Sequence, residues 1–163
     1  MTLFEDIQRR YEDLEAAQLL QLNLLAKAAG NMASGFPTYL GLTAPRWTDR
    51  HGKVGDSYVR LGEGASDKFQ EKRWMLLGSI GGVVPFSLAV TIQSSDKSMQ
   101  TTYVFEMSVK FCEDGYLFDL KDIVEPVVLS VEDVKQENFA PVYNLLLARL
   151  RTVLDPSKIL IKT

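Results

Sequence analysis

The sequence is poor in the residues on which metal centres, disulfides and most acid–base catalysts depend. Among its 163 residues there is one cysteine, Cys112, and one histidine, His51. A lone cysteine excludes an intramolecular disulfide and a metal site built from several cysteines. A lone histidine excludes a two-histidine metal site and leaves scattered carboxylates for acid–base roles. We therefore expect no catalytic residues, no cofactor and no bound metal, and a protein that is not an enzyme.

The sequence also lacks an excess of positive charge and an apolar N-terminal segment. Its formal net charge is −3, so nonspecific binding to nucleic acid or to an anionic bilayer gains no electrostatic help. The first ten residues carry charged side chains where a secretion signal needs an apolar segment. These observations predict a cytoplasmic protein that binds neither nucleic acid nor membrane.

One stretch lacks charged side chains altogether. It runs between Arg73 and Asp96 and, at about 22 residues, is long enough to cross a bilayer. Clustered glycines and Pro85 would weaken or kink a spanning helix. Its second half instead alternates apolar and small polar residues, which is typical of a strand with one buried face. The pattern predicts two strands of a soluble core, over 72–77 and 83–93, with Phe86, Leu88, Val90 and Ile92 on the buried face.

Both ends of the sequence carry helical patterns. Thr2 and Glu5 have the spacing of a capping box, and apolar residues follow at three- and four-residue steps. Because no glycine or proline intervenes before Gly30, the predicted helix has ~27 residues and a length of ~40 Å. A C-terminal helix is predicted from about Asn138, with Pro141 in its first turn. Its buried stripe is expected to comprise Val142, Leu145, Leu146, Leu150, Val153 and Leu154.

The middle of the sequence alternates between turn signals and strand patterns. The predicted pieces are an irregular segment over 30–64, a strand over 102–111, a turn at 113–115, a returning strand over 116–120 and an edge strand over 124–129. The order of elements predicts one domain, 1–163, of the α+β class. It has a long N-terminal helix, an antiparallel meander of five to six strands, and a C-terminal helix packed on the sheet.

A cluster of interface-type residues lies in the irregular segment. Arg46 and Trp47 precede Asp49-Arg50-His51-Gly52, which resembles a turn with glycine in the left-handed position. Indole and guanidinium groups are enriched at protein interfaces, and long irregular segments often serve binding. We therefore predict Arg46, Trp47, Arg50 and His51 as partner-binding residues. The alternative is that Trp47 fills the core while the basic residues flank it in water.

The second half of the first helix holds more leucine than one core stripe can bury. Successive helical residues are ~100° apart, so these leucines point in too many directions for a single contact face. Either the 30–64 segment or a second subunit must cover them. We favour a homodimer in which this helix packs against its symmetry mate or the mate's sheet, because twofold association is the commonest solution. Leu20 and Leu24 are the residues predicted in that interface.

Size, acidic charge and helix–sheet–helix layout are similar to those of small bacterial secretion chaperones and toxin-neutralising proteins, although no motif carries the resemblance. We expect a non-enzymatic, cytoplasmic protein-binding module, acting as an adaptor, chaperone or inhibitor, with another protein as its partner. The alternative function is a small-molecule- or lipid-binding fold with an apolar pocket between the sheet and the C-terminal helix.

Overall fold

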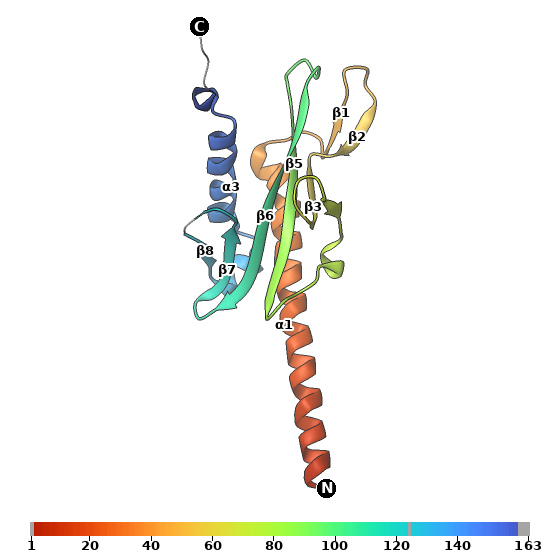
Figure 1. Cartoon of the computed structure of the whole chain (residues 1–163), viewed down its shortest axis with the longest axis vertical. Coiled ribbons are helices and arrows are strands. Elements are labelled where there is room, and N and C mark those ends of the chain that lie inside the picture. Colours follow the sequence, from red (N-terminus) through yellow and green to blue (C-terminus); the bar gives the residue numbers. More distant parts are fainter. Residues whose placement is uncertain (1, 124, 160–163) are drawn as a thin grey trace.

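A computed structural model describes residues 2–123 and 125–159 and begins with a helix much longer than expected. Helix α1 (Leu3–Leu40) has 38 residues, and its N-terminal half projects as a rod from the body of the molecule (Figure 1). The predicted capping box is confirmed. The Thr2 hydroxyl accepts a hydrogen bond from the Glu5 amide at 3.1 Å, and the Glu5 carboxylate accepts one from the Thr2 amide at 3.4 Å.

The prediction that α1 ends at Gly30 is wrong, and the reason is tertiary packing. The helix continues through Gly30, Gly35 and Pro37 and ends at Gly41, whose φ of 79° provides a left-handed cap. A Cβ on Gly30 would lie 2.8 Å from the Trp74 side chain, and one on Gly35 would lie 2.5 Å from the Tyr143 hydroxyl. These glycines therefore admit neighbouring aromatic side chains and do not terminate the helix. The expected loop over 30–64 consequently starts only after residue 40.

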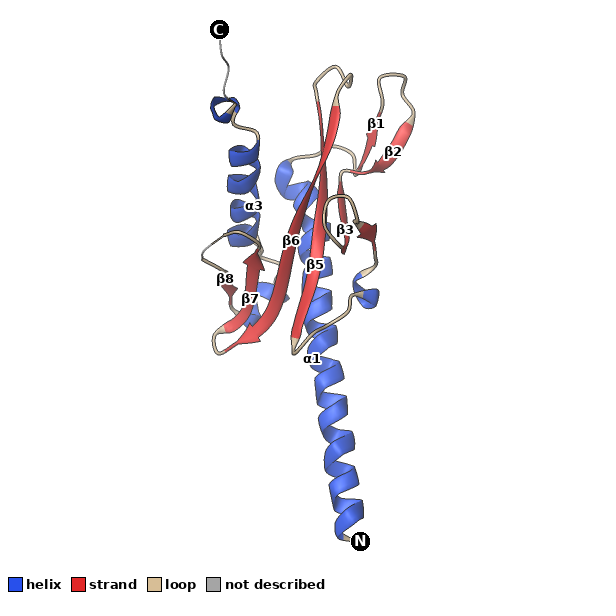
Figure 2. Cartoon of the chain, in the orientation of Figure 1, coloured by secondary structure: helices blue, strands red, loops and turns tan. Residues whose placement is uncertain are grey.

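The strands form one six-stranded antiparallel sheet and a separate hairpin. The hairpin pairs β1 (Arg46–Thr48) with β2 (Val54–Ser57). The sheet has the order β4-β3-β5-β6-β7-β8. Because β4 pairs with the outer side of β3 and does not lie between β3 and β5, the sheet differs from the simple meander that was predicted. Its strands are β3 (Val59–Glu63), β4 (Gln70–Glu71), β5 (Val83–Gln93), β6 (Gln100–Cys112), β7 (Gly115–Leu120) and β8 (Val127–Leu129). The α+β class and the antiparallel sheet are confirmed (Figure 2).

The predicted strand over 72–77 is wrong. This segment contains the 3₁₀ helix η1 (Trp74–Leu76), which packs against α1 where Gly30 leaves room for the Trp74 side chain. The strand that follows is confirmed, and a tight turn precedes it. Ile80 and Val83 exchange two backbone hydrogen bonds around Gly81 and Gly82, whose φ values are 57° and 78°. Two successive positive φ angles define the type of hairpin turn that strongly favours glycine.

Strand β5 is buried on both faces, although one buried face was expected. Phe86, Leu88 and Val90 pack in the core as predicted. On the other face, Ser87 and Thr91 are also buried, and each hydroxyl has a partner. The Ser87 hydroxyl donates to the Gly64 carbonyl at 2.7 Å, and the Thr91 and Thr102 hydroxyls lie 2.9 Å apart. Pairing lets polar side chains occupy a buried face at little cost.

The C-terminal helix α3 (Ala140–Val153) packs on the sheet and against α1. Phe139, just before it, meets Phe118 of β7 edge-on at 6.1 Å between ring centroids. Tyr143 stacks on Phe36 of α1 at 5.1 Å, and its hydroxyl donates to the Met32 carbonyl at 2.7 Å. The predicted buried positions are confirmed for Val142, Leu146 and Leu150, and Leu145 is partly buried. Val153 and Leu154 were also expected in the buried stripe but are exposed, because the buried part of α3 ends at Leu150.

The remaining elements are short. Ser130 caps α2 (Val131–Lys135), as its spacing from Asp133 predicted, and η2 (Pro156–Lys158) follows α3. Strand β8 lies at the sheet edge, in agreement with the prediction, while residue 124 of the expected strand lies outside the described residues. Within 2–123 and 125–159, no helix combines the length and apolar character needed to cross a membrane.

Candidate functional site

An apolar stripe runs along the free half of α1, residues 3–20, which projects from the body. We define the stripe as Phe4, Ile7, Tyr11 and Leu14, whose exposed fractions are 67%, 61%, 63% and 54%. Their spacing of three, four and three residues is that of the a and d positions of a coiled coil. Single exposed apolar side chains are ordinary, whereas a contiguous row of them makes this face a candidate binding site.

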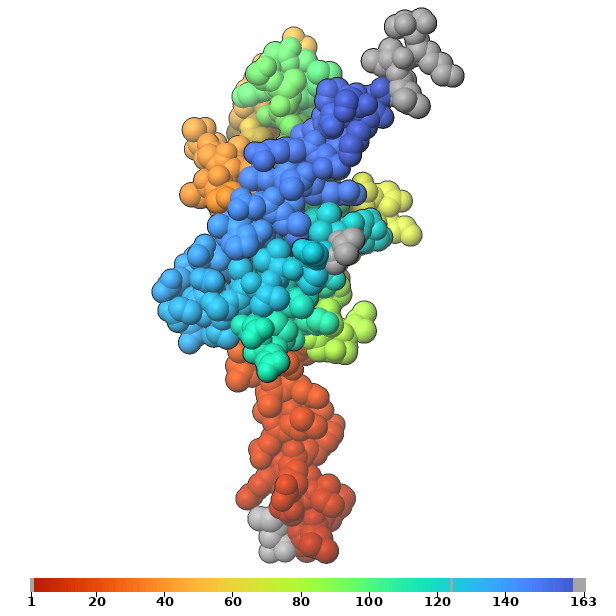
Figure 3. Space-filling model, turned by 90° about the vertical axis from the view of Figure 1, so that its left-hand side faces the viewer, coloured from red at the N-terminus to blue at the C-terminus, as the bar shows by residue number. Residues whose placement is uncertain are grey.

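The stripe continues the face by which α1 packs in the core. The same three- and four-residue steps lead through Gln18 and Gln21 to Leu25, Ala28 and Met32, which are buried. Along α1, every described residue from 7 to 20 is exposed, and Gln21 is the first to be partly covered again. The space-filling view shows the consequence, a bare rod below the body (Figure 3). One helix face is therefore covered by the sheet in its C-terminal half and left open in its N-terminal half.

Most of the charged residues on the free half of α1 are acidic. The free half carries Glu5, Asp6, Glu12, Asp13 and Glu15 against Arg9 and Arg10. The Arg10 Nε donates to the Asp6 carboxylate at 3.1 Å, an exposed pair one helical turn apart. A helix that lies on an anionic membrane surface usually has lysine and arginine on its polar face. The mainly acidic polar face of α1 differs from that pattern.

Leu20 and Leu24, the predicted interface leucines, lie on a different side of α1. They are 61% and 42% exposed. Leu20 follows Tyr11 by nine residues, which at ~100° per residue places it roughly opposite the stripe. Leu24 falls on the same opposite side. The expectation that α1 exposes leucines at several angles therefore agrees with the structure, but the continuous apolar face is the stripe.

The β1–β2 hairpin holds the other predicted binding residues. The Arg46 Nε donates to the Gly55 carbonyl at 2.8 Å, and the Trp47 ring lies directly over Gly55. Trp47 is half-buried there and does not belong to the core, so the alternative in which it fills the core is not what the structure shows. Arg50 and His51 are exposed at the hairpin turn.

A local carboxylate organises that turn. The Asp49 carboxylate accepts the amides of His51 at 2.8 Å and Lys53 at 2.9 Å, and Gly52 has a φ of 81°. The hydrogen bond from the Lys53 amide holds the pKa of Asp49 below its ordinary value, with smaller contributions from His51. The predicted turn with a left-handed glycine is confirmed.

Changing both Arg50 and His51 to Ala is expected to alter the free energy of unfolding by under ~0.5 kcal/mol, as is usual for exposed sites. Urea denaturation of the double variant checks this value. Asp49→Ala is the matched comparison in the same turn and should lower stability more, because two backbone amides lose their acceptor. If the double variant keeps full partner binding, the hairpin turn is a plain loop and not a binding site.

The two sets of predicted residues are not brought together. The β1–β2 hairpin and the free half of α1 lie at opposite ends of the molecule (Figure 1). Cys112 ends strand β6 at the end of the sheet away from the hairpin that carries His51, so the fold does not assemble these two side chains into a nucleophile–base pair. In the described part of the chain, no three His, Cys, Asp or Glu side chains are grouped so that they could hold a metal ion.

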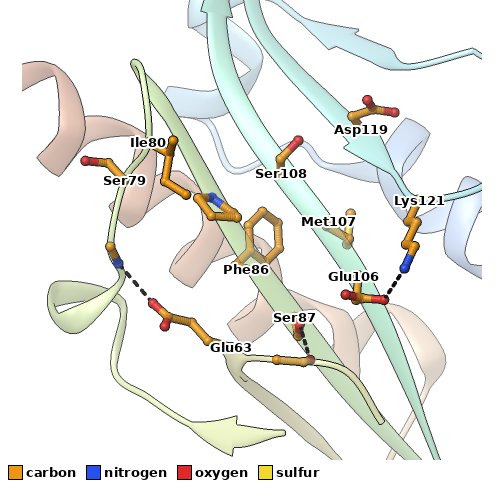
Figure 4. A pocket seen from close by; sticks show the side chains of 13 residues that line it. Glu63, Ser79, Ile80, Phe86, Ser87, Glu106, Met107, Ser108, Asp119 and Lys121 are labelled. Carbon is orange, nitrogen blue, oxygen red and sulfur yellow. Dashed lines mark hydrogen bonds and ion pairs between the residues drawn. The ribbon is translucent and has the colours of Figure 1, made fainter. Parts of the chain in front are cut away.

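A pocket of about 560 Å³ lies on the sheet face away from α1 (Figure 4). Glu63 accepts the Gly78 amide at 2.9 Å and the Lys72 ammonium at 3.0 Å, and these bonds lower its pKa, the amide most. Glu106 pairs with Lys121 at 3.0 Å. Of the three carboxylates that line the pocket, those of Glu63 and Glu106 are thus already paired. No histidine or cysteine is among the lining residues.

The space between the sheet and α3 is filled by side chains. Phe118, Phe139, Val142 and Leu146 meet there, and each is at most 1% exposed. Besides the pocket on the far sheet face, a groove of about 920 Å³ runs between α1, β3 and η1, and a smaller hollow lies beside the β5–β6 turn. None of these three lies between the sheet and α3. The alternative ligand-binding function expects its pocket between the sheet and α3, where Phe118, Phe139, Val142 and Leu146 are packed.

Comparison of the chain with protein-family models, with curated proteins and with solved structures gave no match.

Proposed function

We propose that this protein is a non-enzymatic, cytoplasmic protein-binding module, acting as an adaptor, chaperone or inhibitor, and that the free half of α1 is its binding element. The observation that carries the proposal is the stripe of Phe4, Ile7, Tyr11 and Leu14, each more than half exposed, on a helix that leaves the body. Amphipathic helices are a recurrent means of protein recognition, with anchors at three- and four-residue steps.

The energetics of an unsupported helix favour this use. An isolated helix of fewer than ~12–15 residues is marginal in water, and most helical stability comes from burying an apolar face. The free half of α1 gains its support from the capping box and from continuity with the buried half. A partner that covers the stripe removes apolar surface from water and stabilises these turns at the same time.

The test compares the wild-type chain with two double variants in a pull-down from native lysate. Ile7→Gln with Tyr11→Gln removes the middle of the stripe and keeps the helix length. Leu20→Gln with Leu24→Gln is the matched control on the opposite side of the same helix. We expect the wild-type chain and the control to retain a bound protein in stoichiometric amount, which can be a second copy of this chain. The stripe variant should bind that protein at least tenfold more weakly.

Two outcomes would count against the proposal. Equal binding by wild type and stripe variant would place the binding surface elsewhere. Loss of binding in the control alone would move the interface to Leu20 and Leu24. Circular dichroism of all three proteins shows whether the helix is retained, so that a loss of binding is not mistaken for a loss of fold.

A further inference from the structure

We infer that the partner covering the stripe is a second copy of this chain, with the two α1 helices antiparallel over their free halves. The inference rests on the proposed function and names the occupant of the same surface. Three observations carry it. The stripe is self-complementary, the body covers the same helix face from Leu25 onward, and the charges beside the stripe tolerate the pairing.

The stripe is self-complementary when one helix is reversed. In antiparallel coiled coils an a position of one helix faces a d position of the other, and a pattern of a-d-a-d reads the same backwards. Phe4 then faces Leu14 of the second copy, and Ile7 faces its Tyr11. The twofold axis repeats both contacts, so all four layers are apolar on both sides. An isologous interface requires such a self-complementary patch.

The sheet excludes the parallel arrangement. From Leu25 onward the stripe face of α1 is buried against the body, with Leu25 and Met32 both 0% exposed. In a parallel pair the second helix would run along that face into the sheet, and the two bodies would occupy the same space. In the antiparallel pair the helix of one copy begins before it reaches the body of the other copy, so the two bodies lie at opposite ends of the helix pair. Figure 3 shows that the rod on which the second helix would lie is bare.

The antiparallel register also fits the length of the free segment. Facing Phe4 to Leu14 places Leu3 of the second copy, the first residue of its helix, at the level of Glu15. Gln21 is the first residue of α1 after the exposed run to be partly covered, so the second helix begins several residues short of the body. Extending the overlap by one heptad would instead face Phe4 to Gln21 and Ile7 to Gln18, which pairs apolar with polar side chains.

The flanking charges tolerate this pairing. The Glu15 carboxylate lies beside the first turn of the second helix, where the helix dipole favours negative charge. The two Arg10 side chains approach each other near the twofold axis, but each is already paired with Asp6 of its own helix at 3.1 Å. Exposed like charges cost little compared with the burial of a row of large apolar side chains.

The first measurement is sedimentation equilibrium of the wild-type chain and the two double variants. We expect wild type and the Leu20→Gln/Leu24→Gln control to sediment as dimers of the 18.3 kDa chain. The Ile7→Gln/Tyr11→Gln variant should dissociate at least tenfold more readily, with its helix content unchanged.

The second measurement reports the direction of the helices. In a Cys112→Ser background, Phe4→Cys and Leu14→Cys are made as separate proteins, mixed under reducing conditions and then oxidised. We expect a disulfide only in the mixture, because residues 4 and 14 face each other across the interface. Two copies of Phe4→Cys alone would keep their thiols ~15 Å apart along the helix axis, beyond the reach of a disulfide.

The contrary outcomes separate this inference from the proposed function. A wild-type chain that stays monomeric up to ~100 μM, far above a micromolar dissociation constant, overturns the dimer. If the stripe variant then loses a different partner, such as another protein's helix, the proposed function stands. If it loses nothing, both fail. Faster oxidation of Phe4→Cys alone than of the mixture overturns the antiparallel direction.

Discussion

Replacing Leu88 with Asp is expected to leave the chain without a cooperative folded state. Leu88 is 0% exposed in the centre of β5, and it pairs across the sheet with Leu61 on one side and Phe105 on the other. A buried carboxylate without a partner costs several kcal/mol, a large part of the stability of an ordinary domain. Val90→Asp, one repeat further along the same face, should have the same effect.

Circular dichroism and urea denaturation of the purified variants check this expectation. Thr101→Asp is the matched control, because Thr101 lies on the neighbouring strand β6 and is exposed. It should fold with nearly wild-type stability. A cooperative transition for Leu88→Asp near the wild-type midpoint would mean that β5 is not the centre of the core.

Phe36→Ala is expected to lower the free energy of unfolding by about 3–5 kcal/mol, the usual range for removing a buried phenylalanine. Phe36 is 0% exposed and stacks on Tyr143 of α3. Its removal leaves a cavity where α1 meets α3. The Tyr143 hydroxyl, which is bonded to the Met32 carbonyl, keeps its acceptor, so the loss measures packing and not hydrogen bonding.

Phe36→Leu serves as the comparison for this cavity. It keeps an apolar side chain of similar position and should lose clearly less stability than Phe36→Ala. Urea denaturation at one temperature gives both values. A loss below ~1 kcal/mol for Phe36→Ala would show that residues 30–40 do not dock on α3 as part of one helix.

The strands were predictable because their signal is local. The alternation over 83–93 and 102–111 belongs to the sequence itself, and the structure confirms both strands and the hairpin that joins β6 to β7. The length of α1 was not predictable in the same way. Gly30 and Gly35 break a helix in isolation, but here each makes room for an aromatic side chain more than forty residues away in sequence. The segment 72–77 was wrongly predicted as a strand for the same reason, because its 3₁₀ helix packs against α1 through the contact of Trp74 with Gly30.

The candidate site shows a similar division. The three- and four-residue steps of the apolar residues in the first helix were visible in the sequence, but periodicity alone does not tell whether a helix face is covered. Whether a helix face is covered depends on which turns of the helix lie against the sheet. The residues around position 14 carry no local pattern that tells where this contact starts along the helix. Leu20 and Leu24 were predicted in the interface because the number of leucines in this part of the helix is unusual, whereas the stripe has an ordinary amphipathic pattern.

The placement of the β1–β2 hairpin and the free half of α1 at opposite ends has a consequence for valency. A surface occupied at one end leaves the other end accessible, so two copies joined through α1 would present two hairpins facing outward in opposite directions. If the hairpins bind a target, as the residues of this turn predict, such a dimer would be bivalent, and its avidity would exceed the affinity of either contact. That gain would require targets whose spacing matches the distance that the two joined helices set between the hairpins.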